Sequence, residues 1–197
     1  MISPGKILVA HPKLESGLFG KSVILLTEHH DQGTVGFILN KPCDVSLPKI
    51  MQNRGIAWES QDVLYQGGPL NTSALVIVHT DDFSSTNTMY LPGGLAISSD
   101  ELMIEKIAMD NRPSAFRFLT GICSWAPGQL DHEMKINKSW LTATPNHAII
   151  FNSTGLKQWR KSLNVVAAET TAQYFYCLLY TSPSPRDATL SRMPSSA

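Results

Sequence analysis

The first half of this chain consists of short apolar runs separated by polar turns that contain glycine. The run Val23-Ile24-Leu25-Leu26 is typical. It is far too short to cross a bilayer, which needs about 20 apolar residues, and it suits a strand buried on both faces. The polar segment 29–33 follows and ends in glycine, which predicts a hairpin loop leading into a second strand over 34–40.

The rest of the chain mixes further hairpins with short helices. We expect strands over 6–10, 62–66, 74–79, 115–123 and 147–151, and a hairpin over 89–97. We expect helices over 47–54, 129–135 and 156–163, and one that opens with a capping box at Ser98. Pro42 is expected to stop the pairing of the second strand. This order predicts an α+β fold with a mixed or largely antiparallel sheet.

Composition limits the class of protein. The chain has 197 residues, is 43% hydrophobic and has a formal net charge of zero, which fits one globular domain with a sizeable core. The neutral balance disfavours a dedicated nucleic-acid binder, although a local basic patch would be compatible with it, and mildly favours self-association. Three cysteines without a C-x-x-C pair fit a reducing compartment. With no signal peptide or membrane span, a cytoplasmic protein is expected.

The end of the chain differs in composition. Residues 177–197 are rich in Ser and Pro and resemble a translated sequencing adaptor; a natural disordered tail is the alternative. We therefore predict a folded domain over 1–176 and a disordered tail over 177–197.

The stretch from Trp125 to Glu133, WAPGQLDHE, is the most informative motif. Pro127 and Gly128 suit the two central positions of a type II turn. The helix that follows offers free N–H groups, so the stretch could form a ligand cradle. The alternative is architectural: the tryptophan fills the core and the acidic residues cap the helix.

Other candidates for chemistry are weaker. The turn Gly67-Gly68-Pro69 lacks the Lys and Ser/Thr of a phosphate-binding loop, so a tight turn is favoured. Adjacent His29 and His30 on a strand point to opposite faces, so no metal site and no cofactor is expected. Cys123 would need a base nearby, and a small buried thiol is the simpler interpretation.

Together these motifs resemble the AlgH/YqgE family of bacterial proteins over about residues 3–175. Three blocks carry the resemblance: 19–42, with Leu39-Asn40-Lys41-Pro42; 67–79, with Gly67-Gly68-Pro69-Leu70; and 121–141, with Pro127-Gly128-Gln129-Leu130 and Glu133. Ile122-Cys123-Ser124 stands where the family often has Tyr-Ala-Gly. The resemblance implies a compact α+β domain with a curved mixed sheet or partial barrel and flanking helices. The activity of the family is not established, and some members are labelled transcriptional regulators.

Three functions follow from these observations. The leading one is a protein that binds a small ligand or a protein partner, with no membrane partner. The second is a hydrolase in which Glu133 or His29 is the base and Gln129 orients a water. The third is a regulator linked to nucleic acid. The leading interpretation predicts that three blocks meet in one cleft, formed by Asn40, Gly67, Gly68, Pro69, Trp125, Gly128, Gln129 and Glu133.

Overall fold

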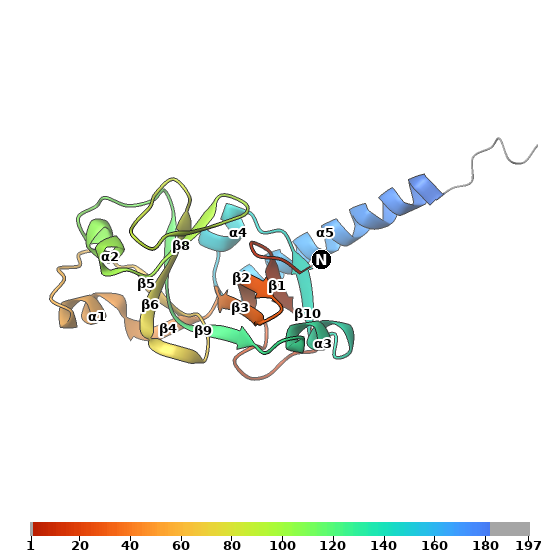
Figure 1. Ribbon diagram of the computed structural model, residues 1–197, viewed down its shortest axis with the longest axis horizontal. Coiled ribbons are helices and arrows are strands. Elements are labelled where there is room, and N and C mark those ends of the chain that lie inside the picture. Colours follow the sequence, from red (N-terminus) through yellow and green to blue (C-terminus); the bar gives the residue numbers. More distant parts are fainter. Residues whose placement is uncertain (1, 182–197) are drawn as a thin grey trace, which may run out of the picture.

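The computed structural model describes residues 2–181, which form ten strands and five helices (Figure 1). The strands are β1 (Ile7–Ala10), β2 (Val23–His30), β3 (Gly33–Ile38), β4 (Pro42–Ser46), β5 (Val63–Gln66), β6 (Leu70–Thr80), β7 (Met89–Leu91), β8 (Leu95–Ser98), β9 (Phe116–Trp125) and β10 (Trp140–Ala143). The helices are α1 (Leu47–Asn53), α2 (Glu101–Ala108), α3 (Gln129–Lys135), α4 (His147–Phe151) and α5 (Gly155–Thr181).

The strands form one curled sheet in the order β10-β1-β2-β3-β9-β6-β8-β7, and β5 joins β4 to β9 beside this path. Strand β9 is the centre of the sheet because it pairs with β3, β5 and β6. Its pairing with β5 is parallel, whereas the other pairings between described strands are antiparallel. The prediction of an α+β domain with a curved, largely antiparallel sheet is confirmed.

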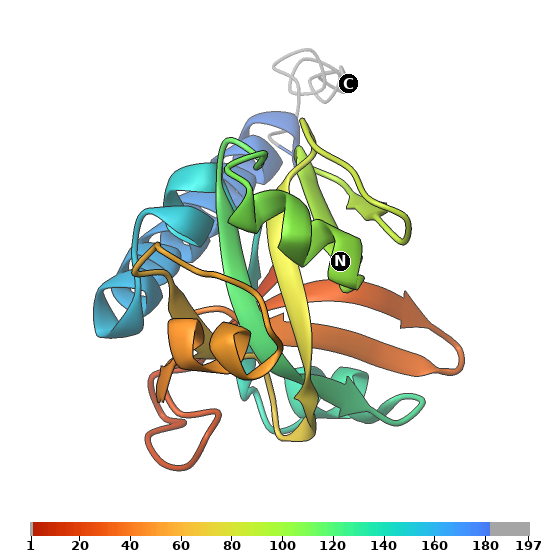
Figure 2. The same ribbon diagram turned by 90° about the vertical axis from the view of Figure 1, so that its left-hand side faces the viewer.

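Two apolar clusters fill the fold. The larger one includes the run from Val23 to Leu26, each residue of which is fully buried, as expected for a strand covered on both faces. The smaller one lies beneath α1 and α2, around Phe118 of β9. Figure 2 shows these two helices on the same side of the sheet. Strand β9 therefore contributes side chains to both cores and connects the two halves of the sheet.

Several predicted boundaries were wrong. The pairing of β3 ends at Ile38, before Pro42, but Pro42 is itself paired: it begins β4, whose outer edge has no strand partner among the described residues, and an edge strand tolerates proline. The segment 147–151 is the helix α4 and not a strand. The predicted capping box at Ser98 is also wrong: Asp100 is the N-cap of α2, and its carboxylate accepts a hydrogen bond from Met103 N at 3.0 Å.

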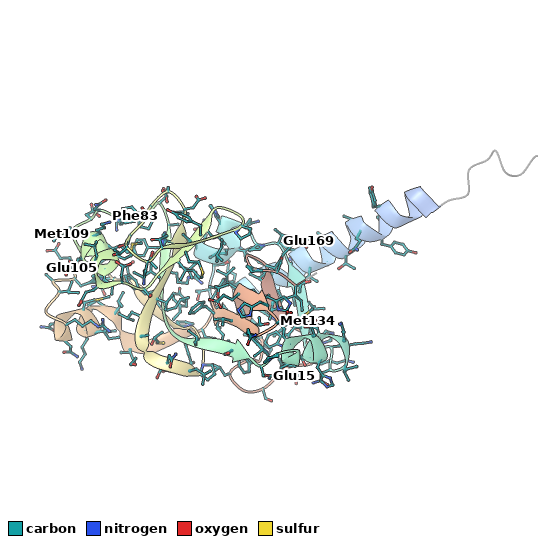
Figure 3. The ribbon with its side chains drawn as sticks, in the orientation of Figure 1. Glu15, Phe83, Glu105, Met109, Met134 and Glu169 are labelled. Carbon is teal, nitrogen blue, oxygen red and sulfur yellow. The ribbon has the colours of Figure 1, made fainter. Side chains whose placement is uncertain are left out.

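Helix α5 is much longer than the predicted 156–163 helix and leaves the body of the domain (Figure 1). Glu169, labelled in Figure 3, ties it to the end of β10, since its Oε1 accepts from Thr144 N at 2.9 Å. The predicted boundary at 176/177 falls inside this helix, and residues 182–197 lie outside the described part, so the tail stays a prediction. Among the described residues, no helix is both long and apolar enough to span a membrane.

His79, in β6, is fully buried, and both of its ring nitrogens have hydrogen-bond partners. Its Nε2 lies 3.0 Å from Ser98 Oγ and its Nδ1 lies 2.8 Å from the carbonyl oxygen of Thr80. Burial lowers the pKa of His79 from its ordinary 6.5, and the hydrogen bond to Thr80 and the charge of Asp82 offset part of this effect. The folded state therefore favours the neutral ring.

We accordingly expect the free energy of unfolding to fall as the pH drops below about 6.5, because the unfolded chain then takes up a proton that the folded chain resists. One such proton changes this free energy by at most about 1.4 kcal/mol per pH unit. Urea unfolding at several pH values, compared between the wild type and His79→Gln, measures this contribution. An equal acid dependence in both proteins would assign it to other groups.

Candidate functional site

The carboxylate of Glu133 is the centre of the WAPGQLDHE stretch. Its Oε2 accepts hydrogen bonds from the indole nitrogens of Trp125 at 3.1 Å and of Trp140 at 2.8 Å. Its Oε1 accepts from Gln129 Nε2 at 2.9 Å. Three donors from the protein thus occupy this carboxylate, which leaves it poorly placed to act as a base towards a substrate.

The rest of the stretch builds the same arrangement. Gly128 has a φ of 72° and Gln129 N donates to the carbonyl of Ala126 at 3.0 Å, which fits the predicted type II turn. The Gln129 side chain accepts from Ala126 N at 3.0 Å and so fixes the turn from outside. Trp125 packs edge-to-face on Trp140, with ring centroids 6.3 Å apart. Strands β9 and β10 and helix α3 are thereby held together, and we call this arrangement the tryptophan clasp.

The turn Gly67-Gly68-Pro69 crosses β9 at close range. Gly67 N donates to Thr120 O at 2.7 Å, and Ile38 N donates to Gly67 O at 2.7 Å. A Cβ on Gly68 would lie far inside 3.0 Å of the Ile122 backbone, closer than real Cβ atoms approach. Pro69 is exposed beside this crossing. The two glycines are therefore explained by the contact between two backbones.

Asn40 is also committed to internal contacts. Its side chain is buried, and its Oδ1 accepts from Val23 N at 2.9 Å. Its Nδ2 donates to Lys21 O at 2.9 Å and to Gly155 O at 3.0 Å. These bonds attach the start of α5 to the segment before β2.

The predicted single cleft is therefore wrong. Thr34 pairs with Trp125 near the beginning of β3, whereas Asn40 follows the end of that strand. Six residues of strand span about 20 Å. Gly67 lies between them, bonded to Ile38, and each block satisfies its polar groups internally. Cys123 is a buried thiol whose pKa burial raises to about 12, as expected for a small buried residue.

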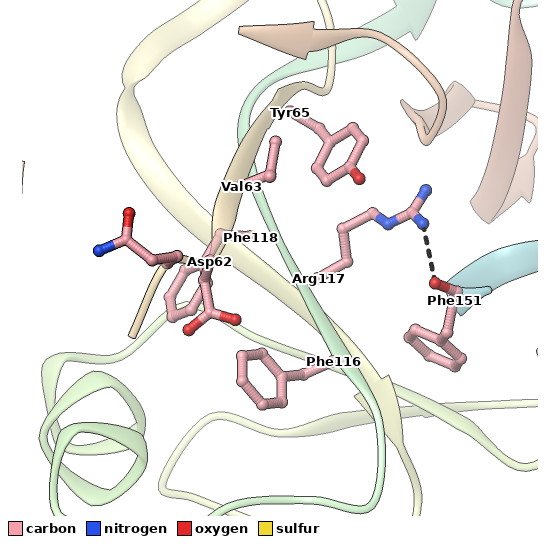
Figure 4. Close-up of a pocket in the computed structure, with 8 residues that line it drawn as sticks. Asp62, Val63, Tyr65, Phe116, Arg117, Phe118 and Phe151 are labelled. Carbon is pink, nitrogen blue, oxygen red and sulfur yellow. Dashed lines mark hydrogen bonds between the residues drawn. The ribbon is translucent and has the colours of Figure 1, made fainter. Parts of the chain in front are cut away.

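A pocket of about 220 Å³ lies elsewhere, between β5, β9 and the end of α4 (Figure 4). Four of its eight lining residues are aromatic, and a carboxylate lies at one side and a guanidinium at the other. The lining residues are Gln61, Asp62, Val63, Tyr65, Phe116, Arg117, Phe118 and Phe151. We call it the Asp62–Arg117 pocket.

Arg117 lies in the central strand β9, and although it is charged, only 5% of its surface is exposed. Its Nη1 donates to Gln158 Oε1 at 3.0 Å and to the carbonyl of Leu39. Its Nη2 donates to the carbonyls of Ser153, at 3.0 Å, and Phe151, at 3.3 Å (Figure 4). Among the described residues no carboxylate forms an ion pair with it. Burial lowers the pKa of this guanidinium, and only neutral groups compensate its charge.

Asp62 forms the opposite wall. Its Oδ2 is buried and has no hydrogen-bond partner among the described residues. Tyr65 packs on the positive side of the pocket, where its ring centroid lies 4.2 Å from the guanidinium carbon of Arg117. In Figure 4 the Asp62 carboxylate and the Arg117 guanidinium point to different sides of the pocket. The pocket thus combines a negative end, a positive end and aromatic walls.

None of the sequence motifs includes a residue that lines this pocket, so the pocket was not predicted. A signal was present, since an arginine between Phe116 and Phe118 in a predicted core strand is a buried charge that requires partners. Those partners come from residues 39, 151, 153 and 158, which no spacing rule connects.

Comparison with known proteins gives a consistent result. A family model described as AlgH-like matches residues 7–170. A UPF0301 protein of Methylococcus capsulatus is 35% identical over 162 residues, which cover 81% of this chain and 88% of that protein. The solution structure of AlgH from Pseudomonas aeruginosa has a TM-score of 0.68 and 27% identity, and the match covers 93% of this chain and 98% of that one. A crystal structure of a Corynebacterium diphtheriae protein has a TM-score of 0.66 and 30% identity, over 81% and 84% of the two chains.

Proposed function

This chain belongs to the AlgH-like family, and we propose that it binds a small molecule in the Asp62–Arg117 pocket. The names of its relatives describe no reaction, so function has to be inferred from the site rather than from the fold. The tryptophan clasp and the turn Gly67-Gly68-Pro69 make their hydrogen bonds and close contacts within the protein. The pocket, by contrast, has a polar atom without a partner.

The buried Oδ2 of Asp62 carries the proposal. A buried acceptor without a hydrogen bond costs about 1–3 kcal/mol, and more when it is charged. Buried polar groups are nearly always paired, so an exception requires an explanation. A ligand that donates a hydrogen bond to this oxygen would recover the lost free energy.

The other walls narrow the chemistry of the ligand. The rings of Phe116 and Tyr65 favour a flat body for the ligand. Arg117 places positive potential at the end away from Asp62. A volume of about 220 Å³ is below the usual 300–1,000 Å³ of ligand pockets and suits a small metabolite. The ligand is thus a small, flat molecule with an amino group for Asp62.

The test is a thermal-shift screen of small aromatic amines and amino-substituted heteroaromatics against the full chain. A ligand at 100 times its Kd stabilises the protein by about 2.7 kcal/mol. We expect Asp62→Asn to lose most of this stabilisation, because the amide removes the charge that attracts the donor. The matched control is Asp31→Asn, at an exposed position in the turn between β2 and β3. An equal shift in Asp62→Asn and the wild type, or no shift with any compound, contradicts the proposal.

A further inference from the structure

We propose that a cationic surface around the start of α5 binds the phosphate backbone of double-stranded nucleic acid. The surface consists of Lys21, Lys41, Lys157, Arg160 and Lys161, and none of them lines the Asp62–Arg117 pocket. The proposal is independent of the small-molecule site, because it rests on other charged side chains, although Arg117 of the pocket bonds to Leu39 and Gln158 beneath this surface.

Asn40 brings the three segments of this surface together. Its Nδ2 bonds to the carbonyls of both Lys21 and Gly155, so the loop before β2 lies against the first turn of α5. Figure 2 shows that turn beside the loop that leads to β2. Lys41 follows Asn40 directly and reaches the same loop, with its Nζ donating to Gly20 O at 2.7 Å.

The remaining three cations share one face of α5. The buried face of this helix presents Gln158, Trp159 and Ser162. Residues advance by about 100° per position in a helix, so 157, 160 and 161 lie together on the opposite side. All three of these side chains belong to exposed residues. Their charges therefore face solvent on the helix whose first residue is joined through Asn40 to the backbone of Lys21.

These charges are not neutralised by the protein. Within the described part of the chain, none of the five side chains forms an ion pair with a carboxylate. Lys21 and Lys41 are close enough to repel each other: burial lowers the pKa of Lys41, and the charge of Lys21 lowers it further. A polyanion that lies across the surface would relieve this repulsion.

The pattern fits nucleic acid better than a lipid surface. Between residues 157 and 164 the outward face of α5 presents Lys157, Arg160, Lys161 and Asn164 and none of the apolar side chains by which interfacial helices enter a bilayer. The exposed large apolar residues of α5 that the structure describes lie outside this stretch, with Leu156 before it and Tyr174 to Tyr176 ten or more residues beyond Asn164. Lysine and arginine contacts to phosphates need no such side chains. The formal net charge of zero is compatible with this proposal, because several acidic residues lie elsewhere: Asp100, Glu101 and Glu105 at the N-cap and in α2, and Asp81 and Asp82 directly after β6.

The experiment is fluorescence anisotropy of a labelled mixed-sequence DNA duplex titrated with the full chain at several salt concentrations. Non-specific binding of this kind has a Kd of about 10⁻⁴–10⁻⁶ M at physiological salt. Each phosphate contact contributes about −0.9 to the slope of log K against log salt. Replacing the three α5 cations, as Lys157→Gln/Arg160→Gln/Lys161→Gln, should make the slope less negative by about 2.7.

The matched control is Lys49→Gln/Arg54→Gln, which removes two exposed cations at α1 and should leave the slope unchanged. Asp62→Asn should also leave it unchanged, which separates this proposal from the small-molecule site. Absent binding, or equal slopes for the triple variant and the wild type, overturns the proposal. Binding of the wild type to phosphatidylserine vesicles but not to the duplex would assign the surface to membranes and equally overturn it.

Discussion

Replacing Gly68 with alanine is expected to destabilise the domain by more than about 4 kcal/mol or to prevent its folding. The new Cβ would overlap the backbone of Ile122, and a Cβ added to Gly121, on the other strand, would overlap the carbonyl of Gly68 in the same way. Both neighbours are backbone atoms in or beside β9, which cannot turn away as a flexible side chain could. Relief of the overlap would separate the β5–β6 turn from the central strand.

Unfolding in urea, followed by tryptophan fluorescence, measures this effect. Gly55→Ala is the matched control, because Gly55 has a φ of 75° but nothing within 4 Å of an added Cβ. It should cost only the conformational penalty of about 1–2 kcal/mol. If Gly68→Ala lowers the free energy of unfolding no more than this control does, the close approach of Gly68 to β9 does not constrain the fold.

Glu133→Ala is expected to cost about 2–4 kcal/mol, because it leaves the indole N–H groups of Trp125 and Trp140 without their acceptor. Both tryptophans are about 95% buried, at 5% and 4% exposure, so water compensates poorly. Glu133→Gln keeps one acceptor oxygen and should have a smaller effect. The quantity to measure is again the free energy of unfolding in urea.

Asp131→Ala tests whether any loss of an acid from α3 would have the same consequence. Asp131 forms a long 3.8 Å ion pair with Lys135, and both side chains are substantially exposed. Such pairs contribute about 0–1 kcal/mol. Wild-type stability in Glu133→Ala would mean that the clasp is not structural, and would restore the catalytic interpretation of this carboxylate.

Elements with a local signal were predictable from the sequence. The turn at Gly128 and helix α3 follow from Pro-Gly and from Asp131 in the first turn, and the structure has both the turn and the helix. The β2–β3 hairpin follows from a buried run, a polar turn and a second run. In each case the determinants lie within about ten residues of one another.

Helix α4 shows why a local signal also misleads. The run Ile149-Ile150-Phe151 is equally compatible with a strand or a buried helix. Asn146 decides the outcome, because its Oδ1 accepts from Ile149 N at 2.9 Å and caps the helix. Asparagine before an apolar run is a start signal that could have been recognised.

The candidate site was less predictable than the fold. Trp125, Gln129 and Glu133 form a hydrogen-bonded network within one stretch, but its remaining member, Trp140, lies on another strand, and this partnership makes the network structural. The Asp62–Arg117 pocket combines side chains from β5, β9 and α4, and their proximity depends on the parallel pairing of β5 with β9. Parallel pairing between distant segments leaves no trace in the spacing of residues.

The location of ligand binding is the central claim, and one comparison of dissociation constants tests it most directly. Calorimetric titration of the best compound from the screen into Asp62→Asn and Gln129→Ala separates the pocket from the clasp. We expect Asp62→Asn to weaken binding at least about tenfold, which corresponds to 1.4 kcal/mol, and Gln129→Ala to leave the Kd within about twofold. Weakened binding in Gln129→Ala with an unchanged Kd in Asp62→Asn would contradict the account and place the ligand at the WAPGQLDHE stretch.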